Sequence, residues 1–569
     1  MKTRLTALMA AILFLVPALS GNAADLDVSA LPTDVGALPP IKGGVLEIDL
    51  LDAYQLALAR NLNLHVSRYD LAIADANIRG SGGIFDPYLT ADVNGNSTQS
   101  PTSTILEGAN VAQSRGTNFY LGVEQLLPTG TVLGGNWTSF RGETNSTFFF
   151  LNPRWDAELN LTLTQPLLNG FGTTVTRSQI IIAENIREQT AVGFEVQVIQ
   201  LLAAVEQAYW ELVATRQQVG VTQQSLDQAV RLLEETQQRV EVGTSAPIDT
   251  VQSEATVATR QQELIYANNA TANAEDNLKA QLGFDLPNEW QVRIETTDSY
   301  EMEPVLPDLQ QSIDAALEKR PAILVQELEL ARLDQNIKVA QNGTLPRLDL
   351  TGSYGWGGVS GTSIIEDPDT GEPIEIRQGW GDSAKQVFDF EFPRWTLGLR
   401  YSVPIGNHRA KEFLAAERYR RDRAGAQLAS LKQQITYDVR LAVRALYDGA
   451  AAIDAAVAAS HLAERNLEAE QTKFNNGLST NFQVSEIQRA LADAKFAEIR
   501  ARVNYRKALA LYFASTGTFL EAIGVKVADP GAPDSVHDYW KDVEWMKFSS
   551  FKESREKVSI PAEPVDTAE

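Results

Sequence analysis

The chain has 569 residues, and its 73 Asp and Glu residues outnumber its 49 Lys and Arg residues, which gives a net charge of −24. This balance argues against nucleic acid as a partner, because nucleic-acid binding needs a basic surface. The chain has no Cys, which excludes disulfides and thiolate metal sites. Its four His residues are not at ligand spacing, so no metal or other cofactor is predicted.

Residues 1–24 are predicted to form a secretory signal peptide. Lys2 and Arg4 precede an apolar run from Leu5 to Leu19, and small residues follow it. We expect cleavage between Ser20 and Ala24. The alternative is an uncleaved anchor, but the apolar run is short for a membrane span. No later segment is long and apolar enough, so the exported chain is predicted to lack transmembrane helices.

The remainder of the chain is a tandem duplication. Residues 57–89 resemble residues 316–348, PRWDAELNLTLTQP (153–166) resembles PRWTLGLRYSVP (393–404), and RVEVGTSAPID (239–249) resembles KFNNGLSTNFQ (473–483). Chance similarity between helical segments could produce one such match, but hardly three in the same order. We predict a first repeat over 47–283 and a second over 309–516. The other segments are an N-terminal linker (25–46), an equatorial linker (284–308), and a C-terminal equatorial segment with an acidic tail (517–569).

Each repeat contains one very long predicted helix, over 173–242 and 408–476. Both segments lack proline, and at 1.5 Å per residue each would be about 105 Å long. Apolar residues recur every seven positions, as in a coiled coil. In the first segment this seam is Val198, Val205, Leu212, Val219, Leu226, Leu233 and Val240. In the second it is Val439, Leu446, Ile453, Leu467 and Phe474, interrupted by Lys432 and Ser460.

The long helices are predicted to end at Gly243 and Gly477, since glycine often follows the last residue of a helix. A second helical segment follows each glycine, over about 247–283 and 480–516. Each repeat is therefore predicted to form a helical hairpin with a tight tip. The shorter helical segments 63–80 and 321–342 could stack end to end with the returning helices.

Residues 155–163 and 395–403 alternate apolar with polar side chains, beginning at Trp155 and Trp395. Strands of this length with one apolar face fit a membrane β-barrel. A soluble sheet with one buried face would show the same alternation, but the export signal and the aromatic ends favour the membrane. We predict that the two Trp residues lie at the membrane interface and that Pro166 and Pro404 mark the junction between barrel and helices. Residues 89–93 and 348–356 are weaker partner strands.

Four strands would leave two open edges, so the chain must form an oligomer or use more strands. The first repeat contains a further hairpin, 119–127 and 131–140, and the sequence leaves open whether it joins the wall. The second repeat carries VSGTSIIEDPDTGEPIEIRQGWGDSAK (359–385) instead, which we expect to form an external loop.

The duplicated halves, QPLLNGFG (165–172) at the strand exit, and the tips VGTSAPID and NGLSTNFQ resemble the TolC family of outer-membrane efflux proteins. The resemblance covers about residues 45–525. It implies an α+β membrane protein in which three copies, each a tandem repeat, close one β-barrel that continues as a long α-helical coiled-coil barrel. It further implies a passive trimeric conduit from periplasm to exterior, in a tripartite efflux pump or a type I secretion system. Its partners would be outer-membrane lipid, a periplasmic adaptor and an inner-membrane pump of the RND, ABC or MFS type.

The resemblance also suggests site residues. The tips that would dock the adaptor are Val242, Gly243, Thr244, Ser245, Gly477, Leu478 and Ser479. The periplasmic constriction would be formed by Asp249, Gln483 and Glu486. Gln483 stands where the family often has a carboxylate, and Ser479 stands where it has a latching Arg. An ordinary solvated helix face is the alternative for Asp249 and Glu486.

Two other classes of protein are considered. A periplasmic coiled-coil scaffold or adaptor without a pore would need no membrane strands. An exported hydrolase would need a nucleophile motif or a cluster of ligands, and the sequence contains no Gly-x-Ser-x-Gly. We therefore expect no catalytic residues.

Overall fold

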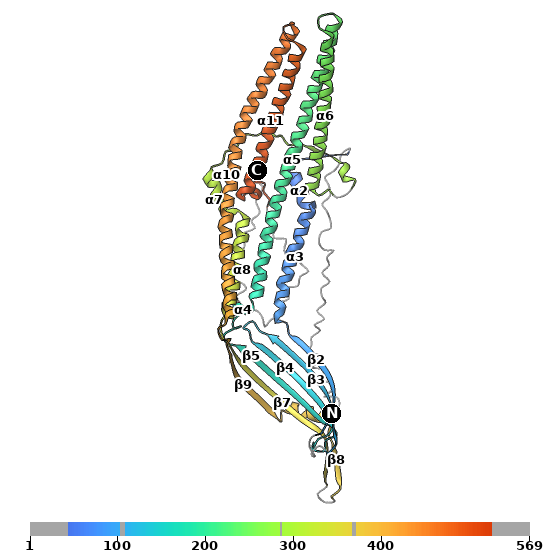
Figure 1. Ribbon diagram of the computed structural model, residues 1–569, viewed down its shortest axis with the longest axis vertical. Coiled ribbons are helices and arrows are strands. Elements are labelled where there is room, and N and C mark those ends of the chain that lie inside the picture. The colour runs from blue at the N-terminus through green and yellow to red at the C-terminus, as the bar shows by residue number, and fades with distance from the viewer. Residues whose placement is uncertain (1–43, 103–107, 285–286, 367–370, 526–569) are drawn as a thin grey trace, which may run out of the picture. The chain divides into compact units, whose positions relative to one another are not determined.

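The structure is a computed structural model that describes residues 44–102, 108–284, 287–366 and 371–525 (Figure 1). The predicted signal peptide, nearly all of the N-terminal linker and the tail beyond residue 525 lie outside the described residues. Within the described part, two similar sets of helices are joined to one antiparallel sheet.

Each repeat begins with a pair of consecutive helices. In the first repeat these are α2 (Leu50–Arg60) and α3 (Leu62–Gly82), and in the second they are α7 (Leu309–Lys319) and α8 (Pro321–Gly343). The backbone is extended at Asn61 and at Arg320, which ends one helix before the next begins. The break therefore lies at the same place in both repeats, as their sequence similarity predicts.

The two long helices are present, but the first is interrupted. The second repeat has the unbroken α10 (His408–Asn475), whereas the first has a single turn, α4 (Thr173–Thr176), before α5 (Ser178–Glu241). Between them Arg177 has φ −89° and ψ 7°, outside the helical region. The prediction of one continuous helix from residue 173 is therefore wrong by one turn.

The returning helices are α6 (Pro247–Leu282) and α11 (Asn481–Thr516), and each ends on the first helix pair of its own repeat. Gly283 and Gly517 both have φ near +75°, namely 77° and 72°. A Cβ atom on Gly283 would lie 2.5 Å from the Arg60 carbonyl oxygen, and one on Gly517 would lie 3.0 Å from the Arg320 Cα. Glycine is therefore needed for conformation and for space. These contacts confirm the end-to-end arrangement expected for both repeats.

The sheet contains six long strands in the order β2 (Tyr88–Pro101), β3 (Val111–Leu126), β4 (Val132–Thr144), β5 (Arg154–Pro166), β7 (Arg347–Glu366) and β9 (Pro393–Ser402). All neighbours are antiparallel, and β9 pairs with β7 on the edge opposite β5. The hairpin β3–β4, whose place the sequence left open, is an interior part of the sheet. A 3₁₀ turn (Gly83–Phe85) leads from α3 into β2.

Residues 359–385 contain regular structure where we expected a loop. Strand β7 extends to Glu366, β8 (Pro373–Arg377) pairs back onto its end, and the helix α9 (Trp380–Phe388) follows. Asp382 begins α9 by accepting a hydrogen bond from the Gly379 amide at 2.8 Å. The turn-forming residues of this segment thus separate short ordered elements. These elements are ordered because β8 pairs with the edge of β7 and α9 packs on its face.

The main core lies where the helices meet the linkers. Strand β1 (Val45–Ile48) pairs in parallel with β6 (Arg293–Thr296), and a 3₁₀ turn (Glu289–Gln291) precedes β6. Both predicted linkers therefore contain a strand. This pair packs with α5 and α6 around the fully buried side chains of Leu46, Leu202, Tyr209, Leu212, Leu278 and Ile294. The short α12 (Phe519–Ala522) adds Phe519 to the same core.

Helix α5 carries a half-buried carboxylate, Glu206, beside this core. The Glu206 carboxylate accepts hydrogen bonds from the Tyr54 hydroxyl at 2.7 Å and from the Trp210 indole at 3.4 Å. Burial raises the pKa of Glu206, and the two donors partly oppose that shift by favouring its charged form. Because these donors leave the carboxylate partnered, the site stabilises the join between α2 and α5 rather than indicating catalysis.

The seam predicted for α10 is buried throughout, and Ser460 lies buried in the position where it interrupts the seam. In α5 the prediction is correct only for Val198, Val205 and Leu212. Beyond these, Val219 and Leu226 are half-buried, and the buried positions are Thr222, Ser225, Ala229, Leu232 and Thr236. A helix drifts about 20° per heptad against a seven-residue repeat, and α5 packs against both α6 and α11. The buried side of α5 therefore changes along its length.

A substitution at Gly358 tests the packing of α9. A Cβ atom there would lie 2.0 Å from the Ser383 carbonyl oxygen of α9, whereas Gly352 on the same face of β7 has nothing within 4 Å. We expect Gly358→Ala to lower the free energy of unfolding in detergent by about 1–3 kcal/mol, the usual cost of overpacking. Gly352→Ala is the matched control. Equal denaturation midpoints for the two variants would contradict the close contact.

Candidate functional site

One face of the sheet is apolar across all six strands. The register places Trp137 of β4, Leu159 of β5 and Trp356 of β7 side by side. The same face carries Val93, Phe119, Val123, Leu133, Leu161, Leu163, Leu397, Leu399 and Tyr401. Many of these side chains are exposed, for example Val93 and Leu397. An exposed apolar face of this extent needs a nonaqueous surrounding or a partner.

The opposite face of the sheet is polar. Asp156, Glu158, Asn160 and Thr162 of β5 lie on it, and Arg394 of β9 forms an ion pair with Glu158 at 2.8 Å. A sheet with one exposed apolar face and one charged face is suited to separate lipid from water.

An aromatic cluster lies on the apolar face where α9 packs against β4 and β7. The Trp137 ring stacks on Phe388 of α9 with centroids 5.4 Å apart and meets Trp380 edge-on at 6.4 Å. Trp356 contacts Phe390 at 4.8 Å. The sequence analysis missed this cluster because α9 was expected to be a loop. The signal that could have found it was the WGDSAKQVF stretch, which is apolar at helical spacing.

The two Trp residues predicted at the membrane interface lie at different levels of the sheet. Trp155 pairs with Ser360 and Trp395 with Tyr354, six residues apart along β7. The Arg141 guanidinium lies 5.5 Å from the Trp155 ring centroid, whereas Trp395 is 72% exposed. Trp395 lies on the edge strand β9 opposite Tyr354, whose ring contacts Trp356 at 4.9 Å, and Trp155 lies further from the helices, opposite Ser360.

The sheet changes into helices at the two proline positions. Pro166 is the last residue of β5, and Pro404 lies two residues beyond Ser402, the last residue of β9. Beyond them, the Leu167 amide donates to the Leu348 carbonyl at 2.7 Å, and the Asn407 side chain donates to the Thr344 carbonyl at 2.9 Å. Segments from both repeats are therefore hydrogen-bonded to each other at this junction.

The hairpin tips of the two repeats have the same backbone structure. Gly243 and Gly477 have φ of 80° and 71°. In each tip, the amide after the glycine donates to a carbonyl five residues earlier, Thr244 to Arg239 and Leu478 to Lys473, both at 2.8 Å. This is the Schellman ending of a helix, which requires a left-handed residue. It leaves the side chains of Val242 and Leu478 exposed by 73% and 78%.

The residues predicted to form a constriction take part in starting the returning helices. Asp249 accepts a hydrogen bond from the Ala246 amide at 3.2 Å, and Gln483 accepts one from the Thr480 amide at 3.3 Å. Glu486 lies one turn further on and forms an ion pair with Arg489 at 2.9 Å. The three side chains are brought to the tip end of the hairpins, and each already has a structural partner.

Ser479 also has a local partner. Its hydroxyl donates to the Glu470 carboxylate, which forms an ion pair with Lys473 at 2.9 Å. The Ser479 hydrogen bond and then Lys473 hold the pKa of Glu470 below its usual value. Glu470 therefore stays ionised near the tip of α10 and orders the turn.

Arg239 joins the two hairpins within one copy, and the sequence analysis did not single it out. Its guanidinium carbon lies 3.9 Å from the centroid of the Phe474 ring, and one of its nitrogens donates to the Phe474 carbonyl at 3.1 Å. Leu232, Phe474 and Val484 form a small buried cluster beside it. On the other side, Asn481 donates to the Asp249 carbonyl at 3.3 Å and to the Ser253 hydroxyl.

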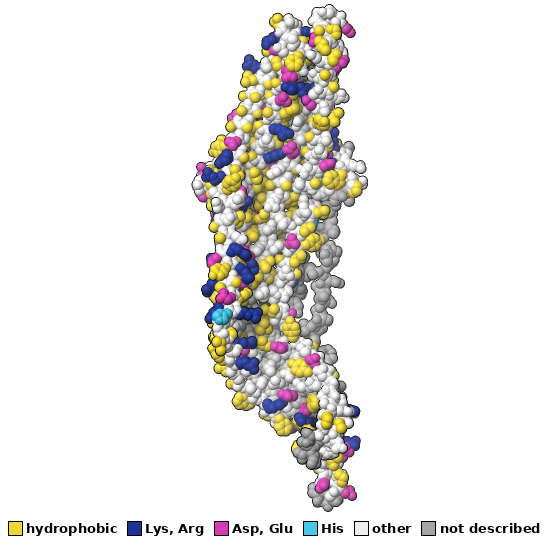
Figure 2. All heavy atoms as spheres, in the orientation of Figure 1, with side chains coloured by type: hydrophobic (Ala, Val, Ile, Leu, Met, Phe, Trp, Pro, Cys, Tyr) yellow, Lys and Arg dark blue, Asp and Glu magenta, His cyan; other side chains and the backbone are white. Residues whose placement is uncertain are grey.

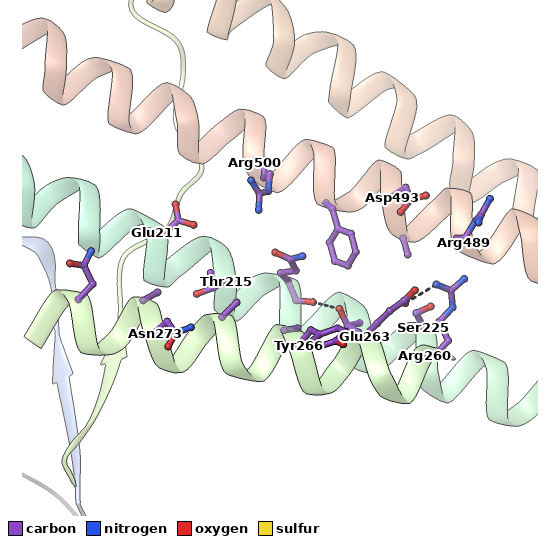
Figure 3. A pocket seen from close by; sticks show the side chains of 18 residues that line it. Glu211, Thr215, Ser225, Arg260, Glu263, Tyr266, Asn273, Arg489, Asp493 and Arg500 are labelled. Carbon is purple, nitrogen blue, oxygen red and sulfur yellow. Dashed lines mark hydrogen bonds and ion pairs between the residues drawn. The ribbon is translucent and has the colours of Figure 1, made fainter. Parts of the chain in front are cut away.

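Between these tip contacts and the main core, the two hairpins enclose a polar groove of about 650 Å³ (Figure 3). Thr215 and Ser225 of α5, Asn273 of α6, and Asp493 and Arg500 of α11 line it. Arg260 and Glu263 form an ion pair at 2.8 Å on its α6 side. A lining of hydroxyls, amides and paired charges is compatible with water between the hairpins.

Positive charge is concentrated next to the sheet. Figure 2 shows Lys and Arg side chains gathered over the part of α10 that adjoins β9. Two of them are paired, Arg420 with Glu417 and Arg421 with Asp334. Within the described ranges, no helix has the length and apolar character needed to cross a bilayer, and no group of three His, Asp or Glu side chains is placed to bind a metal.

Comparison with known proteins gives matches along most of the chain. The family profile described as outer membrane efflux protein matches residues 53–284 and 312–518, one segment for each repeat. Outer membrane protein TolC of Escherichia coli is 28% identical over 305 residues, 52% of this chain and 57% of that protein. The pyoverdine export outer membrane protein OpmQ of Pseudomonas aeruginosa is 24% identical over 312 residues, 54% of this chain and 58% of that protein. The chain thus spans less than two thirds of these relatives.

The fold matches solved outer-membrane channels. The CmeC outer membrane channel of Campylobacter jejuni superposes with a TM-score of 0.58 at 16% identity, covering 83% of this chain and 86% of that one. At this identity the likeness concerns the fold alone. It agrees with the tandem α+β repeat described above.

Replacing Arg239 tests the link between the hairpins. Arg239→Ala removes the contact with the Phe474 ring and one hydrogen bond, worth together about 1–2 kcal/mol. We expect amide hydrogen exchange in the segments around residues 236–246 and 470–480 to become about tenfold faster, which corresponds to 1.4 kcal/mol. Arg231→Ala, an exposed position on the same helix, is the control. Unchanged exchange at both tips in Arg239→Ala would show that the contact does not hold the hairpins together.

Proposed function

The chain belongs to the outer membrane efflux protein family, and from this premise we propose that it is a passive trimeric conduit from the periplasm to the exterior. In this proposal the sheets of three copies close one barrel in the outer membrane, and the helices continue it into the periplasm. The proposal is supported above all by the sheet, whose exposed apolar face and charged opposite face suit lipid on one side and water on the other.

In the described residues, one edge of the sheet is β2, and the other is β9, beyond which the short β8 pairs with the far end of β7. Backbone groups left unpaired in a bilayer cost several kcal/mol each, so a sheet in the membrane must close on itself or on further copies. Strand β2 runs away from the helices and β9 runs back toward them, so the two edges can pair in antiparallel fashion between neighbouring copies. The relatives are membrane channel proteins rather than enzymes, and we propose the same for this chain.

The tips are the proposed docking site for a periplasmic adaptor, which in turn would join an inner-membrane pump of the RND, ABC or MFS type. Val242 and Leu478 project from two tips of identical backbone structure. Exposed apolar side chains on a rigid turn are suited to bind a partner, because little conformational freedom is lost on binding. Gly243, Thr244, Ser245, Gly477 and Ser479 would shape this surface. The inner-membrane pump would decide whether the conduit serves efflux or type I secretion.

Asp249, Gln483 and Glu486 are the proposed periplasmic constriction, with Arg239 as an added element that keeps the hairpins together. Trp155 and Trp395 would contact the lipid interface. Pro166 and Pro404 would mark the periplasmic margin of the barrel, where the strands end and the helices begin. The basic part of α10 lies just beyond this margin, where anionic lipid headgroups would attract it. The alternative function, a coiled-coil scaffold or adaptor without a pore, leaves the apolar face of the sheet without a role.

Charged substitutions at the tips test adaptor docking. Val242 and Leu478 are exposed, so Val242→Asp combined with Leu478→Asp should leave trimer assembly and membrane insertion intact while abolishing cargo export in cells. Val242→Leu combined with Leu478→Val keeps the apolar surface and should export normally. Export by the Asp variant at the level of this control would refute docking at the tips.

The constriction can be tested by ion selectivity. We expect the purified trimer in a planar bilayer to prefer cations, because the chain is strongly acidic and two carboxylates lie near the tips. Asp249→Asn combined with Glu486→Gln keeps hydrogen-bond acceptors but removes both charges, so the cation preference measured from reversal potentials should fall. An unchanged preference would place the selective region elsewhere in the duct.

A further inference from the structure

The hairpin β3–β4 is a wall segment rather than an appendage. Strand β3 pairs with β2 from Tyr88↔Glu124 to Pro101↔Val111, and β4 pairs with β5 from Val132↔Thr164 to Gly142↔Arg154. The hairpin therefore separates β2 from β5 along their whole length. One copy supplies six strands to any wall that the sheet forms, where the sequence patterns alone had indicated four.

The faces of the hairpin agree with those of its neighbours. Phe119 and Val123 of β3 lie on the same face as Leu161 of β5, and all three are between 38% and 50% exposed. Asn118 and Tyr120 lie on the opposite face. Because a shift of one residue would exchange the two faces, the agreement indicates that the hairpin is built to stand in the same lipid–water boundary as β5.

Helix α9 fixes the hairpin to the second repeat. The Trp380 indole donates to the Ser139 hydroxyl of β4 at 2.7 Å, and the Phe388 ring stacks on Trp137 of β4. At the same time, the Gln386 side chain accepts from the Val359 amide of β7 at 2.9 Å. Helix α9 of the second repeat, itself fixed to β7, thus holds β4 of the first repeat in place on the apolar face of the sheet.

The width of the sheet matches the width of the helices that leave it. Four helices join the sheet in each copy, α3 before β2, α4–α5 after β5, α8 before β7 and α10 after β9. Packed side by side at about 9.5 Å, they occupy an arc of about 38 Å. Six strands spaced at about 4.8 Å and tilted by about 40° also occupy about 38 Å, whereas four would occupy only about 25 Å.

We propose that three copies close, through β2 of one and β9 of the next, into a wall of eighteen strands, so that the duct is as wide in the membrane as in its helical part. This inference rests on the proposed trimeric conduit. At the same tilt, the backbone diameter would be about 36 Å, against about 24 Å for a wall of twelve strands. The limit on cargo size would then lie at the tips and not in the membrane.

Spin labels can measure the width, because the chain has no native Cys. Leu161→Cys places one label per copy on the lipid face of β5 in the full-length protein in lipid nanodiscs. Pulsed electron–electron double resonance measures the distances between these labels. After correction for the length of the label side chain, the distance between the Leu161 Cα atoms of two copies should be about 31 Å for eighteen strands, and about 21 Å for twelve. The expected separation is about 1.5-fold larger than the alternative.

A second readout concerns the hairpin itself. Labels at Phe119→Cys and Val123→Cys should be accessible to oxygen dissolved in lipid, and labels at Asn118→Cys and Tyr120→Cys to a water-soluble nickel chelate. Leu161→Cys and Asn160→Cys on β5 are the reference pair. Water access at all four β3 positions, or a separation near 21 Å, would overturn the eighteen-strand wall while leaving the trimer intact. Absence of any distance between copies, or of alternation on β5, would instead refute the proposed conduit.

Discussion

The need to pair every backbone N–H and C=O group of a sheet in lipid is the constraint on which the rest of this structure depends. The sheet has one apolar face, so it suits a bilayer, and it has two open edges, so it cannot be complete in one copy. In the proposed barrel, the number of strands sets the circumference of the wall. The opposite directions of β2 and β9 allow neighbouring copies to pair. The helices themselves need no partner for their backbone, because each satisfies its own N–H and C=O groups internally.

The duplication is preserved in the places where helices must stop. Gly283 and Gly517 end the returning helices on the break between two earlier helices, and Gly243 and Gly477 turn the tips with the same pair of hydrogen bonds. Between these fixed points the two repeats have diverged in complementary ways. The first contains the hairpin β3–β4 and the second contains β8 and α9, and α9 packs on β4 through Trp380 and Ser139. The two segments that differ between the repeats are therefore packed against each other on the sheet.

The tips combine a rigid backbone with a modest link between hairpins. Schellman turns hold Val242 and Leu478 outward, while the Arg239 side chain and Asn481 connect the hairpins with a few neutral or cation–π contacts. Such contacts are worth only about 1–2 kcal/mol. A link of this size can keep the hairpins together and could be broken by the binding energy of the partner proposed to dock at the tips.

Local patterns in the sequence determined the repeats, the long helices, the glycine tips, the strands β5 and β9 and the family resemblance, because periodicity and helix-ending residues act over a few positions. The interruption at Arg177, the changed seam of α5, the place of β3–β4, the helix α9 and the Arg239–Phe474 contact were decided only by the tertiary structure. Each depends on segments far apart in the chain: Arg239 and Phe474 are 235 residues apart, and β4 receives its aromatic partners from α9. A pattern within one segment cannot specify which distant segment will cover it.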